Sequence, residues 1–267
     1  MPNWKLTVEY DGTRYYGWQE QKHARTVAGE LRLAAERFLS KPVEMMGAGR
    51  TDAGVHAIAQ VASLKSERRA KPLELLRALN DRLPSDINVL RVEEAHPRFD
   101  PRRDALARFY LYQIATRRSA FAKRYVWWVK DRLDVDSMRQ AAEALAGRHD
   151  FSSFCEATDE ERSTIVVVEQ VEVAIDGELL LFRIGASHFL WKMVRRIVGT
   201  LVEVGRGSIG VQDFKRLVES RSQGARAEEF QVAAHTAPPS GLFLERVTYN
   251  KSEKILPLAA AFGVKKA

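Results

Sequence analysis

Apolar and polar residues alternate along several short stretches of the chain. In residues 4–10, Trp4, Leu6, Val8 and Tyr10 fall on one side of an extended backbone and polar residues fall on the other, a pattern typical of a half-buried β-strand. Elsewhere apolar residues recur every three or four positions, as on one face of a helix. Within the first hundred residues these patterns predict strands at 43–46, 55–64 and 87–94 and helices at 26–39 and 72–82.

The second part of the chain has a similar rhythm. Asp176 and Gly177 stand between two apolar runs, which predicts a β-hairpin. Apolar residues in 188–205 have helical spacing, and Gly205 is expected to end that helix. The other predicted elements are strands at 105–114, 125–129 and 241–249, a helix at 134–146 and two shorter helices before the last strand. Strands with packed helices in two successive units indicate an α+β fold.

Charge narrows the class of partner. The net charge is +7, and basic residues recur in pairs such as Arg102-Arg103, Arg117-Arg118 and Arg195-Arg196. Lys and Arg gain free energy by displacing counterions from phosphates, so a polyanion such as nucleic acid is the leading partner class.

The sequence also excludes several kinds of protein. A single cysteine, Cys155, rules out a disulfide framework and a CxxC metal site. The apolar runs are too short to span a membrane, and the first twelve residues do not resemble a signal peptide. We therefore expect a cytoplasmic protein that binds no membrane.

The stretch GAGRTDAGVH, residues 47–56, carries the most unusual candidate chemistry. It lacks the Lys and Ser/Thr of a Walker phosphate loop, and Asp52 occupies the third glycine position of a dinucleotide fingerprint. No second cluster of His or carboxylate residues accompanies it, so a metal site is not indicated. What remains is one carboxylate on a bent loop beside Arg50, which has either a chemical role or a structural role in a turn.

The longer segment GAGRTDAGVHAIAQV resembles the signature of the tRNA pseudouridine synthase A family. Further segments that resemble the family follow in its order: YDGTRYYGWQEQ, ARFYLY, GRHDFSSFC, FLWKMVRRIVGTLVEVG and APPSGLFLERV. The resemblance implies the pseudouridine synthase fold, in which two ferredoxin-like halves share an extended, mostly antiparallel sheet with flanking helices. We expect the halves at 1–104 and 105–250, followed by a C-terminal tail at 251–267.

The family resemblance implies isomerisation of uridine to pseudouridine in tRNA, without cofactor or metal. The bond between N1 and C1′ breaks, the uracil turns, and C5 bonds to C1′. Asp52 takes the role of the nucleophile. Attack at C1′, attack at C6 and a glycal route all begin with an ionised Asp52, and all three stay open.

The same resemblance assigns other site residues. Arg195 would keep Asp52 charged, and we expect it on a polar stripe of its helix together with His188 and Lys192. Tyr110 would stack on the target base and take part in catalysis, while Leu242 and Leu244 would form an apolar pocket wall. Each of these side chains could otherwise be an ordinary core or surface residue.

Arg50 would hold the RNA strand opened when the target uridine leaves its stack. The other residues expected to contact RNA are Arg14, Phe99, Arg102, Arg103, Arg118, Thr158 and Arg162. One departure from the family pattern lies among them, because Asp100 adds a negative charge in the segment FDPRRD.

The resemblance further implies uridines 38, 39 and 40 of the tRNA anticodon stem-loop as targets, and a homodimer. Two other classes stay open. A non-catalytic RNA-binding protein would need Asp52 only for structure. A nuclease would need clustered carboxylates and metal, and a glycosidase two carboxylates.

Overall fold

The computed structural model describes residues 1–156, 163–219 and 231–264, and these form two compact units. Unit 1 comprises Met1–Arg108 and Phe243–Glu253, and unit 2 comprises Phe109–Leu242 together with Lys254–Ala267. The first crossing falls four residues after the boundary expected at 104. The last strand groups with unit 1 from Phe243 onward, and it pairs parallel with β3 (His56–Ser66) of that unit.

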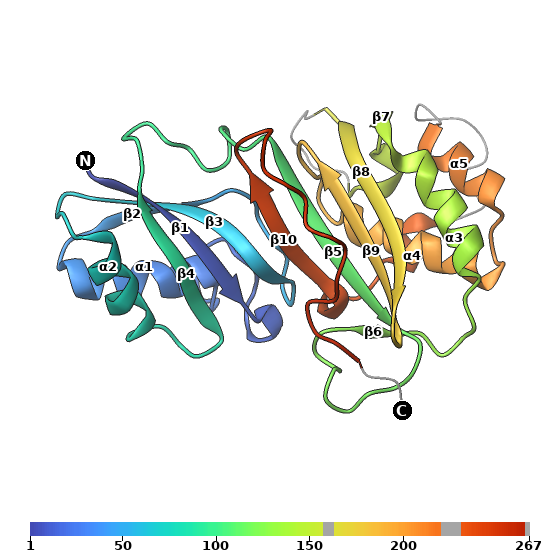
Figure 1. Ribbon diagram of the computed structural model, residues 1–267, viewed down its shortest axis with the longest axis horizontal. Helices are drawn as coiled ribbons and strands as arrows, with labels where there is room; N and C mark the ends of the chain where they lie inside the picture. The colour runs from blue at the N-terminus through green and yellow to red at the C-terminus, as the bar shows by residue number, and fades with distance from the viewer. Residues whose placement is uncertain (157–162, 220–230, 265–267) are drawn as a thin grey trace. The chain divides into compact units, whose positions relative to one another are not determined.

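The strands of unit 1 follow the order β4-β1-β3-β10, with β2 paired to β3 (Figure 1). Their bounds are β1 Asn3–Tyr10, β2 Val43–Gly47, β3 His56–Ser66, β4 Ile87–Glu94 and β10 Leu242–Thr248. β1 pairs antiparallel with both β3 and β4, whereas β10 runs parallel to β3. The four strands predicted from the first hundred residues are confirmed.

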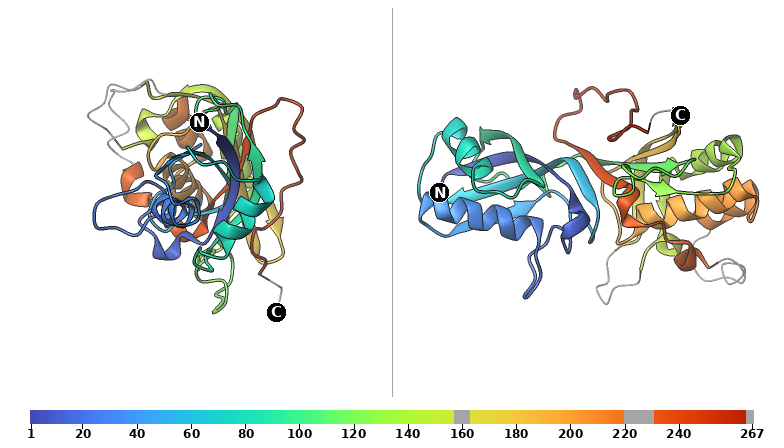
Figure 2. Two further views of the ribbon diagram at one scale, coloured as in Figure 1. Left: turned by 90° about the vertical axis from the view of Figure 1, so that its left-hand side faces the viewer. Right: turned by 90° about the horizontal axis from the view of Figure 1, so that it is seen from below.

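Two helices cover the apolar face of this sheet. Trp4, Leu6, Val8 and Tyr10 of β1 are buried, as the alternation predicted. Helix α1, Val27–Leu39, begins after Thr26, whose side chain accepts a hydrogen bond from the amide of Gly29, and it runs along one face of the strands (Figure 2). Helix α2, Pro72–Asn80, has its proline in the first turn.

The strands of unit 2 follow the order β5-β9-β8-β7, and the short β6 pairs parallel with β5. Their bounds are β5 Ala107–Ala115, β6 Trp127–Trp128, β7 Gly147–Asp150, β8 Ile165–Asp176 and β9 Leu179–Ala186. β8 and β9 form the predicted hairpin, with Gly177 at φ +60° in its turn. Strand β7 was not predicted, since only four residues form it. Both units therefore combine strands and helices with mostly antiparallel pairing, which confirms the α+β class.

The helices of unit 2 are α3 Val135–Ala142, α4 Met193–Arg206 and α5 Val211–Glu219. The prediction that α4 begins near 188 was wrong by five residues. Lys192, at its N-terminus, has a left-handed conformation with φ +60°, so His188 lies before the helix. The expected polar stripe of His188, Lys192 and Arg195 therefore does not exist.

The C-terminal segment from Lys254 covers a face of the unit 2 strands. It lies on the side opposite α4 in both views (Figure 2). Arg183 of β9, only 1% exposed, donates hydrogen bonds to the carbonyl oxygens of Leu256 at 2.9 Å and Pro257 at 3.3 Å. Gln113 of β5 accepts one from the amide of Ala261 at 2.6 Å. The tail, which the sequence left without structure, is thus part of the packing of unit 2.

Candidate active site

Asp52 lies in the loop that joins β2 to β3 in unit 1, and its side chain is partly exposed. Gly54, two residues later, has φ +77°, a conformation that side chains other than glycine rarely adopt. Thr51 is buried, and its hydroxyl lies 2.8 Å from the hydroxyl of Tyr10. The loop therefore has a defined bend, and Asp52 lies at its surface.

The segment Asp11–Trp18 fixes the backbone on both sides of Asp52. The amide of Trp18 donates to the carbonyl of Thr51 at 3.1 Å, and the amide of Gly54 donates to the carbonyl of Tyr15 at 3.3 Å. Gly17 makes this approach possible, because a Cβ there would lie 2.5 Å from the oxygen of Thr51. Backbone hydrogen bonds thus join the motifs YDGTRYYGW and GRTDAGVH on both sides of the carboxylate.

His56, the last residue of the motif, links the same two segments. It is 1% exposed, its ring stacks on Phe243 at 4.8 Å, and its Nδ1 lies 3.0 Å from the amide nitrogen of Gly12. Nδ1 also lies 3.2 Å from a carboxylate oxygen of Asp11. The Nδ1 atom can serve only one of these partners at a time. Without a proton it accepts a hydrogen bond from the amide of Gly12, and with a proton it donates one to the carboxylate of Asp11.

These contacts strongly lower the pKa of the Asp11 carboxyl. Burial acts to raise the pKa of its carboxyl, but hydrogen bonds from His56 and Thr13 outweigh burial, and the pKa lies well below its usual value. The carboxylate also accepts from the amide of Thr13 at 2.9 Å. Asp11 therefore stabilises the start of the segment that fixes Asp52.

Arg108 supports the other end of the loop and was not singled out by the sequence. Its side chain is buried, and Nε and Nη2 donate to the carbonyl of Ala48 at 3.3 and 3.0 Å. Arg50, by contrast, is exposed on the loop beside Asp52. One arginine thus positions the loop, while the other is available to solvent and to a ligand.

Tyr110 belongs to unit 2 and lies on β5. It is 7% exposed, and its ring meets that of Phe189 edge to face at 4.9 Å. Tyr112, two residues on, donates from its hydroxyl to the carbonyl of Pro238 at 2.7 Å. Burial raises the pKa of Tyr112 well above its ordinary value, so its phenol stays protonated and has a structural role.

Arg195 also belongs to unit 2, in the first turn of α4. Its Nε donates to the carbonyl of Ala237 at 2.7 Å, and the amide of Ala237 donates back to the carbonyl of Arg195 at 3.0 Å. A solvated helix face is excluded for this partly buried side chain. Its neighbour Arg196 lies 3.7 Å from a carboxylate oxygen of Glu156, which Lys192 also contacts.

The family of tRNA pseudouridine synthases matches residues 6–102 and 141–250 of this sequence. The chain belongs to that family. It is 40% identical to tRNA pseudouridine synthase A of Thermosipho melanesiensis over 251 residues, which cover 93% of this chain and all of that protein. It is 38% identical to the Brucella ovis and Brucella abortus proteins of the same name over 254 residues, which cover 93% of this chain and 98% of each relative.

Among solved structures, an archaeal box H/ACA sRNP Nop10-Cbf5 complex gives a TM-score of 0.35 at 14% identity, over 74% of this chain and 43% of that chain. The resemblance found in the GRTDAGVH segment is thus confirmed by the sequence relatives, which cover nearly the whole chain.

In this pseudouridine synthase the residues expected to form an apolar wall are both buried. Leu242 is 5% exposed in unit 2, and Leu244 is fully buried in unit 1, where it pairs with Ala57 of β3. Between them, Phe243 stacks on His56. Phe243 and His56 could have been noticed in the sequence only through their place in motifs, because a buried aromatic residue is the common case.

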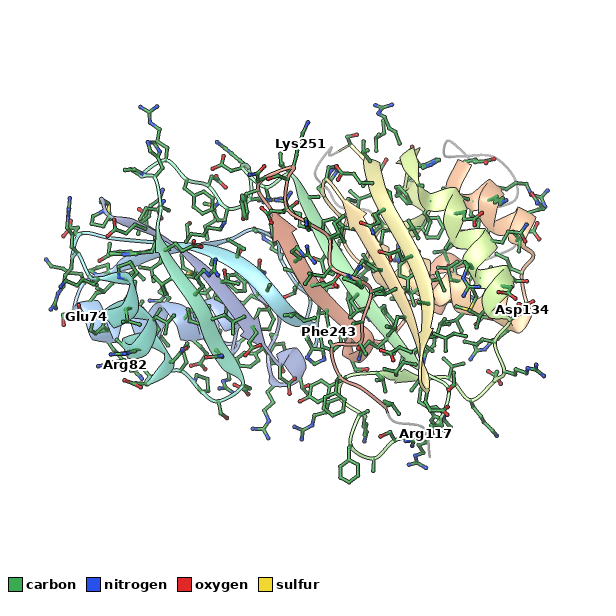
Figure 3. All side chains as sticks on the ribbon, in the orientation of Figure 1. Glu74, Arg82, Arg117, Asp134, Phe243 and Lys251 are labelled. Carbon is green, nitrogen blue, oxygen red and sulfur yellow. The ribbon has the colours of Figure 1, made fainter. Side chains whose placement is uncertain are left out.

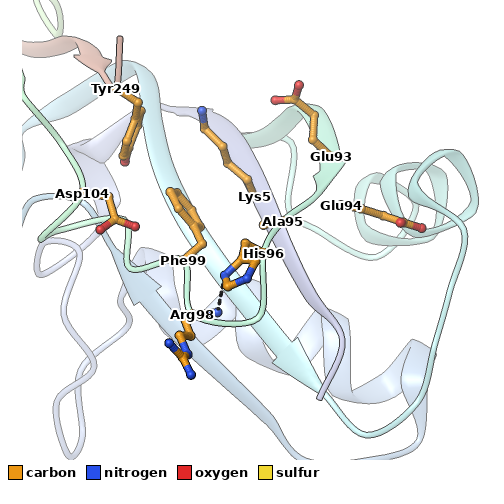
Figure 4. A pocket seen from close by; sticks show the side chains of 9 residues that line it. All are labelled: Lys5, Glu93, Glu94, Ala95, His96, Arg98, Phe99, Asp104 and Tyr249. Atoms are coloured by element: carbon orange, nitrogen blue, oxygen red, sulfur yellow. Dashed lines mark hydrogen bonds between the residues drawn. The ribbon is translucent and has the colours of Figure 1, made fainter.

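Phe99 lines a surface pocket of about 470 Å³ in unit 1 (Figure 4). Its ring lies 5.4 Å from that of Tyr249, and the ammonium of Lys5 lies 4.3 Å from the centre of the Tyr249 ring. Arg98 and Asp104 also border the pocket. Opposite charges and two aromatic rings are therefore combined at one of the positions expected to contact RNA.

The remaining residues expected to contact RNA have different surroundings. Arg14, Arg102, Arg103 and Arg118 are exposed, whereas Thr158 and Arg162 lie outside the described residues. Asp100, the departure from the family pattern, accepts the amides of Arg102 at 2.8 Å and Arg103 at 3.0 Å. Its carboxylate therefore shapes the turn that presents the two arginines.

Within the described parts of the chain, no group of three or more His, Cys, Asp or Glu side chains could hold a metal ion. Within the same residues, every helix is too short or too polar to cross a bilayer.

Proposed function

We propose that this protein converts uridine to pseudouridine at positions 38, 39 and 40 of the tRNA anticodon stem-loop, with Asp52 as the nucleophile. Membership of the tRNA pseudouridine synthase family over most of the chain is the observation that carries the proposal. Relatives that are 38–40% identical to the chain are named tRNA pseudouridine synthase A. The fixed loop around Asp52 supports the assignment of the nucleophile.

The chemistry asks little of the protein beyond positioning and charge. Uridine and pseudouridine have the same atoms, so the reaction breaks one bond to C1′, forms another, and moves the C5 proton without any oxidant or co-substrate. An ionised carboxylate can begin each of the possible routes. The backbone that carries it must stay in position relative to the nucleoside while the base turns. The hydrogen bonds on both sides of Asp52 provide that support.

The other assigned residues complete the proposal. Arg195 stabilises the carboxylate of Asp52 in its charged form, and Tyr110 stacks on the target base. Arg50, exposed on the same loop as Asp52, contacts the RNA backbone where the uridine is displaced from its stack. Arg14, Phe99, Arg102, Arg103 and Arg118 are proposed as further RNA contacts, in a cytoplasmic homodimer.

Mapping of pseudouridine in a tRNA transcript tests this function. The transcript is incubated with the protein in EDTA, treated with a carbodiimide that marks pseudouridine, and read by primer extension. We expect stops at positions 38–40 with the wild type and with Asp81→Ala, which removes an exposed carboxylate of the same unit, but none with Asp52→Ala. Stops elsewhere would contradict the proposed target, and cleavage of the transcript would contradict the proposed reaction.

A further inference from the structure

The loop that joins β5 to β6 in unit 2 exposes an aromatic side chain at its tip. Phe121 is 89% exposed, and its nearest neighbours in the chain, Ala120 and Ala122, are too small to cover it. Trp128, in β6 at the end of the loop, is 41% exposed. Figure 1 shows the loop extending away from the strands of the unit. The ring of Phe121 is therefore accessible to a ligand.

Local hydrogen bonds hold the loop in shape. The amide of Ala122 donates to the hydroxyl of Ser119 at 3.2 Å, and the amide of Tyr125 donates to the carbonyl of Ala122 at 2.8 Å. Gln113 of β5 donates to the carbonyl of Tyr125 at 2.9 Å. The aromatic tip is thus presented in a fixed position, which lowers the entropic cost of binding.

All charged residues within the loop are basic. Residues 116–126 contain four basic residues and no acidic residue: Arg117, Arg118, Lys123 and Arg124. Arg118 lies 5.8 Å from the centre of the Trp128 ring, and Arg117 stands at the start of the loop (Figure 3). A nearby carboxylate, Glu178, accepts a hydrogen bond from Thr116. Exposed aromatic rings among cations are the recognised means of binding single-stranded nucleic acid.

We propose that Phe121 stacks on an unpaired base of the tRNA, outside the position of the target uridine, while the basic residues of this loop bind the neighbouring phosphates. This rests on the proposed function, since it takes tRNA as the substrate. A phenyl ring can stack on any base, because every base has a π face. The loop therefore contributes affinity and placement of the RNA rather than chemistry.

Equilibrium binding of a tRNA transcript to Phe121 variants tests the proposal. We expect Phe121→Ala to raise Kd about tenfold, Phe121→Leu to raise it nearly as much, and Phe121→Trp to keep it near the wild-type value, because only Trp retains a stacking face. Ile175→Ala is the matched control, since Ile175 is 63% exposed in the same unit. All variants should keep the wild-type Tm, because Phe121 and Ile175 are exposed.

The charges are tested separately. Arg118→Gln should reduce the slope of log Kd against log salt concentration by about 0.7, the loss of one phosphate contact on a single strand. An unchanged slope would contradict the role of that arginine.

Failure of this inference is distinct from failure of the proposed function. If the wild type makes pseudouridine and Phe121→Ala binds tRNA as tightly as the wild type does, the loop has no role in RNA binding and the inference is wrong. If Phe121→Ala instead dissociates a dimer in sedimentation at unchanged Kd, the loop contacts a second copy of the chain, which also overturns it. If the wild type makes no pseudouridine, the proposed function fails whatever the variants show.

Discussion

The charged side chain of Arg108 is almost completely buried, and its nitrogens donate hydrogen bonds to backbone carbonyl oxygens. Two of its nitrogens hold the oxygen of Ala48, four residues before Asp52. A guanidinium can make this two-pronged contact, whereas an ammonium presents a single point of charge. A few buried polar contacts of this kind determine where the loop lies.

Arg108→Lys tests that role. We expect a loss of about 1–3 kcal/mol in the free energy of unfolding, because one charged hydrogen bond to Ala48 is lost, and a fall in kcat as the loop loosens. Denaturant unfolding and single-turnover rates measure the two effects. Arg91→Lys serves as the control, since the Arg91 side chain is 70% exposed in the same unit. Equal behaviour of the two variants would contradict the assignment.

Asp11 gives a prediction about pH. Its folded pKa lies below the unfolded value, so the ionised carboxylate stabilises the native state at every pH above the unfolded value near 3.8 and loses that effect as pH falls below it. Asp11→Asn should therefore be less stable than the wild type at pH 7, and the difference should shrink below about pH 4. Thermal unfolding across pH 3–7 measures it. A difference that does not depend on pH would show that the charge has no part.

Among the elements, the strands were predictable where one face is buried and the other is not, as in β1. The start of α4 was not predictable, because the apolar spacing continues through residues 188–192 although Lys192 turns left-handed. The parallel pairing of β10 with β3 joins residues nearly two hundred positions apart, which no local pattern encodes. Asp52 stood out through its motif, whereas Arg108 and His56 act through contacts that only the folded chain brings together.

Gly199 of α4 shows how closely one element can approach another in unit 2. A Cβ at this position would lie 1.4 Å from the carbonyl oxygen of His235. Alanine normally stabilises a helix relative to glycine, but here the segment that holds Arg195 through Ala237 would have to move.

We therefore expect Gly199→Ala to cost about 1–3 kcal/mol of stability and to lower kcat. Differential scanning calorimetry and turnover measure the two. Gly263→Ala, where a Cβ meets nothing within 4 Å, should change neither quantity. A more stable Gly199→Ala would show that the segment yields easily.

At the scale of the whole chain, the C-terminal tail completes the packing of unit 2. Arg183 is buried beneath it and uses the tail's carbonyl oxygens as acceptors, besides an ion pair with Glu172 at 3.0 Å. Without the tail, a buried guanidinium would lose two of its partners, which is costly in a medium of low polarity.

A chain that ends at Glu253 should be less stable than the full chain by at least about 3 kcal/mol. Chemical denaturation measures this, and a chain that ends at Val264 is the control that keeps the carbonyl oxygens of Leu256 and Pro257 as acceptors for Arg183. Equal stability of the chains ending at 253 and 264 would show that the tail contributes nothing to folding.

Asp52 is proposed to begin the isomerisation of uridine in tRNA. Release of tritium from tRNA that carries [5-³H]uridine, measured in EDTA for the wild type and for Asp52→Ala, tests this role. We expect release by the wild type and none by the variant, although both bind the tRNA with similar Kd. Release by Asp52→Ala, or no release by the wild type from a broad pool of tRNA, would contradict it.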